Sequence, residues 1–203
     1  MRQPLLHGID LGSPLRGGRT TRTATGLELE AGGADIWGHR DECHFAFTPV
    51  DGNFEASVRI HALSMADVYT KAGLMLRASL AEGSAHVMLL SFGDNQPRNR
   101  NNGGLEFQSR AETDGPCAGI YPPQPLPPQP DFPVHFPHVW LKLVRAGATF
   151  TALASSDGRA WRTFCVHQQE LPTQAYLGLA VTSHHPEQTV RATFDPLTLA
   201  DPT

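Results

Sequence analysis

The chain has 203 residues, of which 40% are hydrophobic and 18% are charged, and its net charge at pH 7 is −4. The apolar content is enough for a packed core and excludes a disordered chain. No cluster of Lys or Arg occurs, which argues against a nucleic-acid partner. No apolar run approaches the roughly 20 residues of a membrane helix, so we expect no membrane partner either.

Three cysteines, Cys43, Cys117 and Cys165, occur at unrelated spacings. An odd number without a metal-binding pattern predicts reduced thiols, and neither a disulfide framework nor a zinc site. Residues 1–8 lack the apolar segment of a secretion signal. We therefore expect a cytoplasmic protein with free thiols and without a bound cofactor.

Short segments of alternating polarity follow one another along the chain. Ile9 and Leu11 alternate as an edge strand, and residues 93–104 have the composition of a loop. The other predicted strands are residues 27–30, 34–38, 44–48, 54–63, 69–80, 86–92, 105–110, 140–144, 149–154, 161–166, 175–183 and 190–199. Many short strands without helical crossovers predict an all-β fold, a two-sheet antiparallel jelly-roll sandwich, as a single domain over residues 1–203.

A proline-rich insertion occupies about residues 115–138. Proline lacks the amide donor that a sheet requires and fixes φ, so this segment is predicted to be extended and polyproline-like, not a strand. Two interpretations remain open. The segment either packs across the surface of its own domain or binds a protein partner, as an adaptor would.

Three consecutive predicted strands, residues 69–80, 86–92 and 105–110, sort their side chains onto two faces with a period of two residues. The apolar face holds Leu74, Leu76, Val87, Leu89 and Phe107. The opposite face holds Lys71, Arg77, His86, Glu106, Gln108 and Arg110. Charged side chains on a sheet need either water or partners, so this face predicts either an open groove for a polar ligand or a closed network of ion pairs.

Several motifs taken together resemble one known family. They are Ala34-Asp-Ile-Trp-Gly, His44-Phe, Lys71-Ala-Gly-Leu-Met-Leu-Arg, Trp140-Leu-Lys-Leu-Val-Arg, Ser155-Ser-Asp-Gly-Arg-Ala-Trp and Tyr176-Leu-Gly-Leu-Ala-Val-Thr-Ser-His. The chain resembles, from about Ile9 to Leu199, the regulation-of-enolase-type domain family of unknown function in the concanavalin A-like lectin/glucanase superfamily. The resemblance implies a jelly-roll sandwich whose concave sheet often holds carbohydrate, and it implies no activity. Leu153 and Ala154 replace two tyrosines that are usual in relatives.

The polar face and the resemblance together predict a non-catalytic domain that recognises carbohydrate or another polar small ligand. The residues expected to bind hydroxyl groups are Lys71, Arg77, His86, Glu106, Gln108 and Arg110, with His44 as a further candidate. Trp37 is a candidate ring platform because an indole combines a large apolar face with a polar N–H, although it could equally cap the core.

An enzyme acting on sugars is the alternative, a lyase or hydrolase with His86 or Glu106 as general base. A glycosidase needs two carboxylates on either side of the scissile bond, and no Glu-x-Asp-x-x-Glu pattern occurs in the chain. We therefore expect no catalysis, and we expect Glu106 to form an ion pair with Lys71, Arg77 or Arg110.

Residue spacing predicts no transition-metal site. The adjacent His184 and His185 would point to opposite sides of a strand and so make a poor chelate. Asp195 is a weak candidate for a structural Ca²⁺, since some superfamily members hold the ion near the corresponding strand. A strand-end turn is the simpler interpretation of Asp195.

Overall fold

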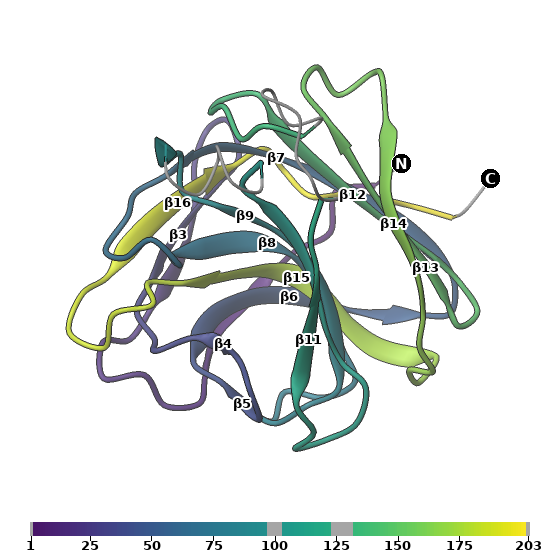
Figure 1. Cartoon of the computed structure of the whole chain (residues 1–203), viewed down its shortest axis with the longest axis horizontal. Helices are drawn as coiled ribbons and strands as arrows, with labels where there is room; N and C mark the ends of the chain where they lie inside the picture. The colour runs from purple at the N-terminus through teal and green to yellow at the C-terminus, as the bar shows by residue number, and fades with distance from the viewer. Residues whose placement is uncertain (1, 97–102, 123–131, 202–203) are drawn as a thin grey trace.

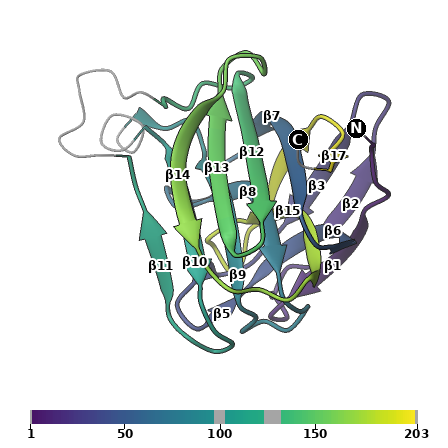
Figure 2. The ribbon, with the colours of Figure 1, turned by 90° about the vertical axis from the view of Figure 1, so that its right-hand side faces the viewer.

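The computed structural model describes residues 2–96, 103–122 and 132–201. The elements whose bounds are described are all β-strands, as the sequence predicted. They form two large antiparallel sheets stacked face to face and one small hairpin (Figures 1 and 2). Within the described ranges, no helix has the length and apolar character needed to cross a membrane.

The seven-stranded sheet contains the three strands that carry the predicted polar face. Its strands in spatial order are β1 (His7–Leu11), β6 (Cys43–Asp51), β15 (Gln174–Thr182), β8 (Lys71–Arg77), β9 (His86–Phe92), β10 (Leu105–Arg110) and β11 (Cys117–Ile120). The nearly all-apolar strand β9 lies between β8 and β10, as expected for a strand in the middle of a sheet.

The eight-stranded sheet covers one face of the first sheet, and Figure 2 shows its strands β12 to β14 in front of β8 and β9. Its strands in spatial order are β14 (Arg162–Gln168), β13 (Thr149–Ser155), β12 (Val139–Ala146), β7 (Phe54–Leu63), β16 (Val190–Phe194), β3 (Leu27–Ala31) and β2 (Arg19–Arg22), and β17 (Thr198–Ala200) pairs with β7. Strands β7 and β12 alternate between buried and half-exposed side chains, the pattern of a sheet with one wet face.

The main core lies between the two sheets. Its members include Leu74, Leu76, Val87, Leu89 and Phe107, all without exposed surface. The predicted architecture and the predicted apolar face are therefore confirmed. The period of two residues was sufficient to predict which side chains form this face, because alternate side chains of a strand point to opposite sides.

A second apolar cluster lies on the opposite face of the seven-stranded sheet, which we call the outer face. Met75, Met88, Leu90 and Phe92 belong to this cluster, and Ile36 covers them without any exposed surface of its own. Ile36 belongs to the hairpin of β4 (Ile36–Trp37) and β5 (Arg40–Asp41). The ribbon of the seven-stranded sheet bends around this hairpin (Figure 1).

The segment predicted as a proline-rich insertion is structured differently at its start. Residues 117–120 form β11, which pairs with β10 along the sheet edge, so the prediction that the whole segment lacks a strand is wrong. These four residues contain no proline, and each can therefore supply its amide to the ladder. Residues 123–131, the central part of the predicted protein-docking segment, lie outside the described part of the chain.

The three cysteines are free, as predicted. Cys43 is buried in the second apolar cluster, and burial raises the pKa of its thiol far above the ordinary value. Burial also raises the pKa of Cys165 to about 12. These two thiols are therefore protonated and unreactive at neutral pH.

Truncating Leu89 to alanine should destabilise the fold by about 2 to 5 kcal/mol, because the substitution leaves a cavity between the sheets. Leu15, which is 69% exposed, provides the control, and Leu15→Ala should change the free energy of unfolding by less than about 0.5 kcal/mol. Urea denaturation of both variants measures the difference. Equal stabilities would contradict the described packing.

Candidate ligand-binding site

The outer face brings together the side chains that the sequence placed on one polar surface. Arg77 pairs with His86 across β8 and β9, and Arg110 pairs with His86 across β9 and β10. Lys71 and Gln108 follow the same alternation on their strands. However, the polar residues do not form one continuous surface, because the apolar cluster around Met88 and Leu90 separates them into two groups.

One end of the outer face is a closed ion cluster that is centred on Asp41 of the hairpin. Arg110 donates to both carboxylate oxygens, from Nη2 to Oδ1 at 2.7 Å and from Nη1 to Oδ2 at 2.8 Å. Arg77 Nη1 donates to Oδ2 at 2.5 Å. None of the three side chains has exposed surface. The two guanidinium groups hold the pKa of Asp41 below its ordinary value even though burial opposes this.

His86 and Cys117 lie beside this cluster. His86 Nδ1 is 3.6 Å from Asp41 Oδ2, and His86 Nε2 is 4.0 Å from Cys117 Sγ. Burial lowers the pKa of His86 to about 3 and raises the pKa of Cys117 to about 11. A neutral imidazole therefore faces a protonated thiol at neutral pH, which is not the thiolate of an activated nucleophile.

Asp41, His86 and Cys117 are also close enough to one another to share a metal ion. Both carboxylate oxygens of Asp41 already accept hydrogen bonds from Arg77 and Arg110. Two buried guanidinium groups in contact with the same carboxylate oppose a further cation at this position. Arg77, His86 and Arg110, which were expected to contact a ligand, thus belong to a closed network.

His44, a further predicted site residue, faces away from the outer face. It pairs with Val181 of β15, whose side chain is in the main core. His44 Nδ1 lies 2.7 Å from Asp10 Oδ1, and its Nε2 lies 2.9 Å from Thr20 Oγ1. Since β1 and β2 belong to different sheets, these contacts tie the two sheets together at one edge.

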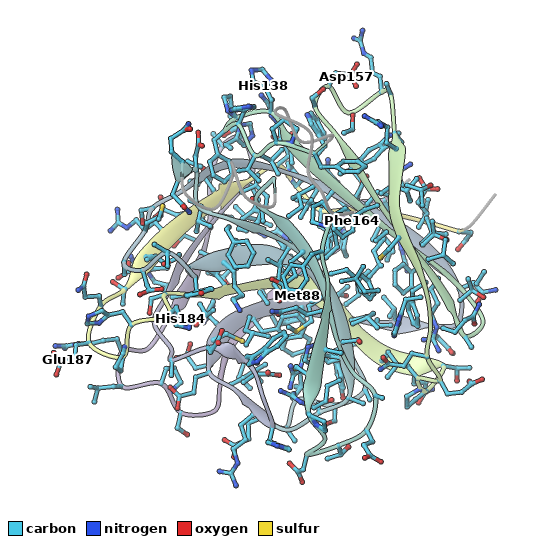
Figure 3. All side chains as sticks on the ribbon, in the orientation of Figure 1. Met88, His138, Asp157, Phe164, His184 and Glu187 are labelled. Carbon is cyan, nitrogen blue, oxygen red and sulfur yellow. The ribbon has the colours of Figure 1, made fainter. Side chains whose placement is uncertain are left out.

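The other end of the outer face is open, and a cavity of about 320 Å³ lies there. Its lining comes from the hairpin, the ends of β8 to β11 and the loop after β15: Asp35, Trp37, Tyr69, Lys71, Phe92, Glu106, Gln108, Tyr121 and His184. Three aromatic side chains form an exposed rim, with Trp37 38% exposed and Tyr69 and Tyr121 each 46% exposed. In Figure 3, His184 lies toward the margin of the outer face and Met88 near its centre.

The floor of the cavity is polar and buried. Lys71, Glu106 and Gln108 are between 1% and 3% exposed, and Gln108 Nε2 donates to Glu106 Oε1 at 2.9 Å. A Cβ atom at Gly119 would lie 2.8 Å from Glu106 Oε1 and 3.1 Å from the Tyr121 hydroxyl oxygen. The glycine on β11 therefore leaves the room that the Glu106 carboxylate occupies.

Asp35 organises one wall of the cavity. Lys71 Nζ lies 2.8 Å from Asp35 Oδ1, and His184 Nε2 lies 3.3 Å from Asp35 Oδ2. The other ring nitrogen of His184, Nδ1, lies 3.1 Å from Asp67 Oδ1. The Lys71 ammonium group is 6.0 Å from the centre of the Trp37 ring. The predicted pairing of basic residues with Glu106 is therefore replaced by pairing with Asp35 and, in the closed cluster, with Asp41.

The closed cluster and the open cavity are connected through the β4–β5 hairpin. Arg110 donates to the main-chain oxygens of Trp37 and Gly38 at 3.3 and 3.2 Å, and the amide of Cys117 donates to Gly38 at 3.0 Å. The hairpin thus supplies Asp41 to the buried end and Trp37 to the cavity. Arg110 of the ion cluster therefore fixes the position of Trp37 through the main chain of the hairpin.

Five residues that line the cavity were not among the predicted site residues, and all of them follow the alternation with a period of two residues. Tyr69 precedes Lys71 by two residues, Phe92 follows His86 by six, Tyr121 follows Gly119 by two and His184 follows Thr182 by two. Phe92 lies within β9 and the other three lie just beyond strand ends, so the same period of two residues would have found all four. The fifth, Asp35, lies two residues before Trp37. No local signal marks Asp41, because its partners lie on β8 and β10.

A second cavity of about 760 Å³ lies beside β12 to β14 and is lined by residues that include Phe132, Val134, His138, Trp140 and Arg162. Phe132 directly follows the undescribed residues 123–131. None of the predicted ligand-binding residues lines this cavity. We therefore regard the cavity on the outer face as the candidate site.

The predicted Ca²⁺ candidate, Asp195, contacts a histidine. Its Oδ1 lies 2.6 Å from His61 Nε2. Among the described residues, Asp195 belongs to no group of three potential ligands that could share an ion. The Ca²⁺ site stays a prediction without further support.

Replacing Asp41 by asparagine should destabilise the protein by about 3 to 5 kcal/mol, because two buried guanidinium groups lose their counter-charge. Arg40 on the same hairpin provides the control. Its side chain is 74% exposed and pairs with Glu82 at the surface, so Arg40→Ala should change stability by less than about 1 kcal/mol. Chemical denaturation at pH 7 compares the two. A small effect of Asp41→Asn would show that the cluster is hydrated.

Replacing His86 by glutamine should remove part of the pH dependence of stability. The folded protein keeps the imidazole neutral down to a pKa of about 3, whereas the unfolded chain binds a proton below the ordinary value of 6.5. Wild-type stability should therefore fall as the pH drops below 6.5, by up to roughly 1.4 kcal/mol per pH unit from this group.

Urea unfolding between pH 7 and pH 5 measures this contribution, and His86→Gln should show the shallower loss. The exposed His138 offers a matched control, since His138→Gln should keep the wild-type slope. Equal slopes for all three proteins would mean that His86 is protonated in the folded state.

No protein-family model matches the chain, and no curated protein matches it in sequence. Solved structures are similar to it in fold. A functionally unknown protein from Saccharomyces cerevisiae matches with a TM-score of 0.68 and 19% identity over 97% of each chain. The GH43 protein BlXynB from Bacillus licheniformis matches with a TM-score of 0.60 and 12% identity, over 89% of this chain and 34% of that one.

The exoplasmic/lumenal domain of VIP36, in a Ca²⁺- and Man3GlcNAc-bound form, matches with a TM-score of 0.57 and 13% identity, over 98% of this chain and 84% of that one. At these identities the likeness concerns the fold alone. Membership of the regulation-of-enolase-type family stays a prediction. The chain has the concanavalin A-like two-sheet sandwich fold that the resemblance implied.

Proposed function

We propose that this protein binds carbohydrate, without cleaving it, in the cavity on the outer face of the seven-stranded sheet. The proposal rests on one observation, that an exposed aromatic rim and a buried polar floor occur in the same cavity. Three exposed aromatic side chains, Trp37, Tyr69 and Tyr121, surround a buried polar floor. The cavity volume of about 320 Å³ lies at the lower end of the range for small-molecule sites.

A sugar ring matches this combination chemically. Its C–H faces are apolar and can stack on aromatic rings, while its hydroxyl groups both donate and accept hydrogen bonds. Aromatic side chains left in water around a concave polar surface are typical of a binding site. The Lys71 ammonium is already neutralised by Asp35 at 2.8 Å, so this cation is not an unpaired charge that awaits an anion.

The loop that carries Tyr69 is held in a fixed conformation. Thr70 Oγ1 accepts hydrogen bonds from the amides of Ala66 and Asp67 and donates to the carbonyl of Ser183 at 2.7 Å. Tyr69 also packs on His184, with ring centres 5.1 Å apart. A rim that is ordered before the ligand arrives loses little conformational entropy on binding.

The neighbours in fold support the proposal without identifying a ligand. The VIP36 domain was solved with Man3GlcNAc bound, and the similar domain from Entamoeba histolytica is described as legume lectin-like. A domain of this fold also forms about a third of the GH43 protein, since the likeness covers 34% of that chain. Of the two bases considered for an enzyme, His86 is enclosed in the ion cluster, and only Glu106 lines the cavity.

The test is a glycan array followed by calorimetric titration of the best ligands. Trp37→Ala should weaken binding by about tenfold or more, because the ligand loses its stacking platform, and should change the free energy of unfolding by less than about 1 kcal/mol. Trp161→Ala is the matched control, since Trp161 packs on Lys142 of the other sheet and does not line the cavity.

Two results would overturn the proposal. One is the absence of binding to any glycan by the wild type at millimolar concentration. The other is binding that Trp37→Ala and Trp161→Ala affect equally. Cleavage of a bound glycan, detected by chromatography of the products, would replace the binding function with the enzymatic alternative based on Glu106.

A further inference from the structure

One described residue that lines the cavity has a buried amide oxygen for which the described part of the chain provides no hydrogen-bond donor. Gln108 is 1% exposed, and its Oε1 has no hydrogen-bond partner among the described residues. Only one other buried side-chain atom of the described residues shares this status, His184 Nδ1, which still lies 3.1 Å from the Asp67 carboxylate. Both side chains line the same cavity.

The orientation of the Gln108 amide is fixed by its neighbour. Nε2 donates to Glu106 Oε1 at 2.9 Å, and a carboxylate oxygen requires a donor, so the amide oxygen must point away from Glu106. The residues that pair with Gln108 on the flanking strands are Met88 and Gly119. Neither has a side chain that can donate a strong hydrogen bond. These two cross-strand neighbours therefore provide no donor for Oε1.

Lys71 provides an unused donor on the same floor. Its ammonium group has three N–H bonds, and two acceptors are present, Asp35 Oδ1 at 2.8 Å and the main-chain oxygen of Ile36 at 3.4 Å. The group lies 6.0 and 5.8 Å from the ring centres of Trp37 and Phe92. Within the described part of the chain, the third N–H has no acceptor.

We infer that Gln108 determines ligand specificity by accepting a hydrogen bond from one hydroxyl group of the bound sugar, while Lys71 donates to a neighbouring hydroxyl. This inference rests on the proposed function and adds the chemical class of the ligand. A hydroxyl group can donate to Oε1 and accept from an ammonium. The ligand is therefore a pyranoside with adjacent free hydroxyl groups, and an analogue lacking the donating hydroxyl is rejected because Oε1 stays unpaired.

The experiment combines a protein variant with a ligand series. Gln108→Met keeps the length and nearly the volume of the side chain and removes both amide groups. Gln168→Met is the control, since Gln168 is exposed on β14 of the other sheet. The probe is the methyl pyranoside that the wild type binds best on the glycan array, together with its monodeoxy derivatives, each titrated by calorimetry.

For the wild type, one monodeoxy derivative should bind about five- to tenfold more weakly than the parent, the effect of one hydrogen bond. Gln108→Met should bind the parent more weakly by a similar factor and should no longer distinguish that derivative from the parent, because both changes remove the same contact. Gln168→Met should behave like the wild type. Thermal melts verify that each variant is folded.

Four outcomes overturn the inference, and they separate it from the proposed function. If Trp37→Ala abolishes glycan binding while Gln108→Met binds like the wild type, the inference fails and the proposed function stands. The same holds if wild type and Gln108→Met discriminate equally among all the monodeoxy derivatives. If the wild type binds no glycan, both fail. If Gln108→Met does not fold, the ligand series is measured on the wild type alone. The inference then fails if the wild type binds every monodeoxy derivative as tightly as the parent.

Discussion

The organisation of the outer face depends on one buried carboxylate. Asp41 lies without exposed surface between Arg77 and Arg110, and each guanidinium contacts it at 2.8 Å or less. A guanidinium that lost this partner would be an isolated charge beside the apolar side chains of Met75 and Met88, an arrangement with a large desolvation cost. The three groups are therefore stable only together. Because they come from β5, β8 and β10, they also fix the hairpin onto the sheet.

This constraint divides the outer face into three parts. At one end the arginines are closed off by Asp41, in the middle Ile36 covers an apolar cluster, and at the other end the sheet is open. The hairpin that closes the first end also supplies Trp37 and Asp35 to the open one. Asp35 in turn neutralises Lys71. Asp41 on the hairpin and Asp35 directly before it thus determine which basic residues are enclosed in the ion cluster and which lie beside the cavity.

The fold alone leaves the function open, because neighbours in fold include a legume lectin-like domain and part of a GH43 protein. The proposed binding of carbohydrate therefore depends on the chemistry of the site. There, an exposed aromatic rim and a buried floor with an unused acceptor occur together. The aromatic rim favours a ligand with an apolar surface, and the buried acceptor favours a ligand with a hydrogen-bond donor. A pyranoside, the ligand class that we infer, has both. The ordered loop around Thr70 keeps the rim in place for it.

The sequence by itself determined the all-β class, the antiparallel sheets and the two faces of β8 to β10, because the period of two residues is a local property of an extended chain. Four of the residues that it proposed as ligand contacts, Lys71, Glu106, Gln108 and Trp37, line the cavity. Only the tertiary structure decided that Arg77, His86 and Arg110 are enclosed. Their partner Asp41 lies 36 residues from Arg77 and 69 from Arg110 along the chain, so no local pattern connects them. An exposed charge and a buried ion pair have the same residue types, and what separates them is the long-range contact that removes water from both partners.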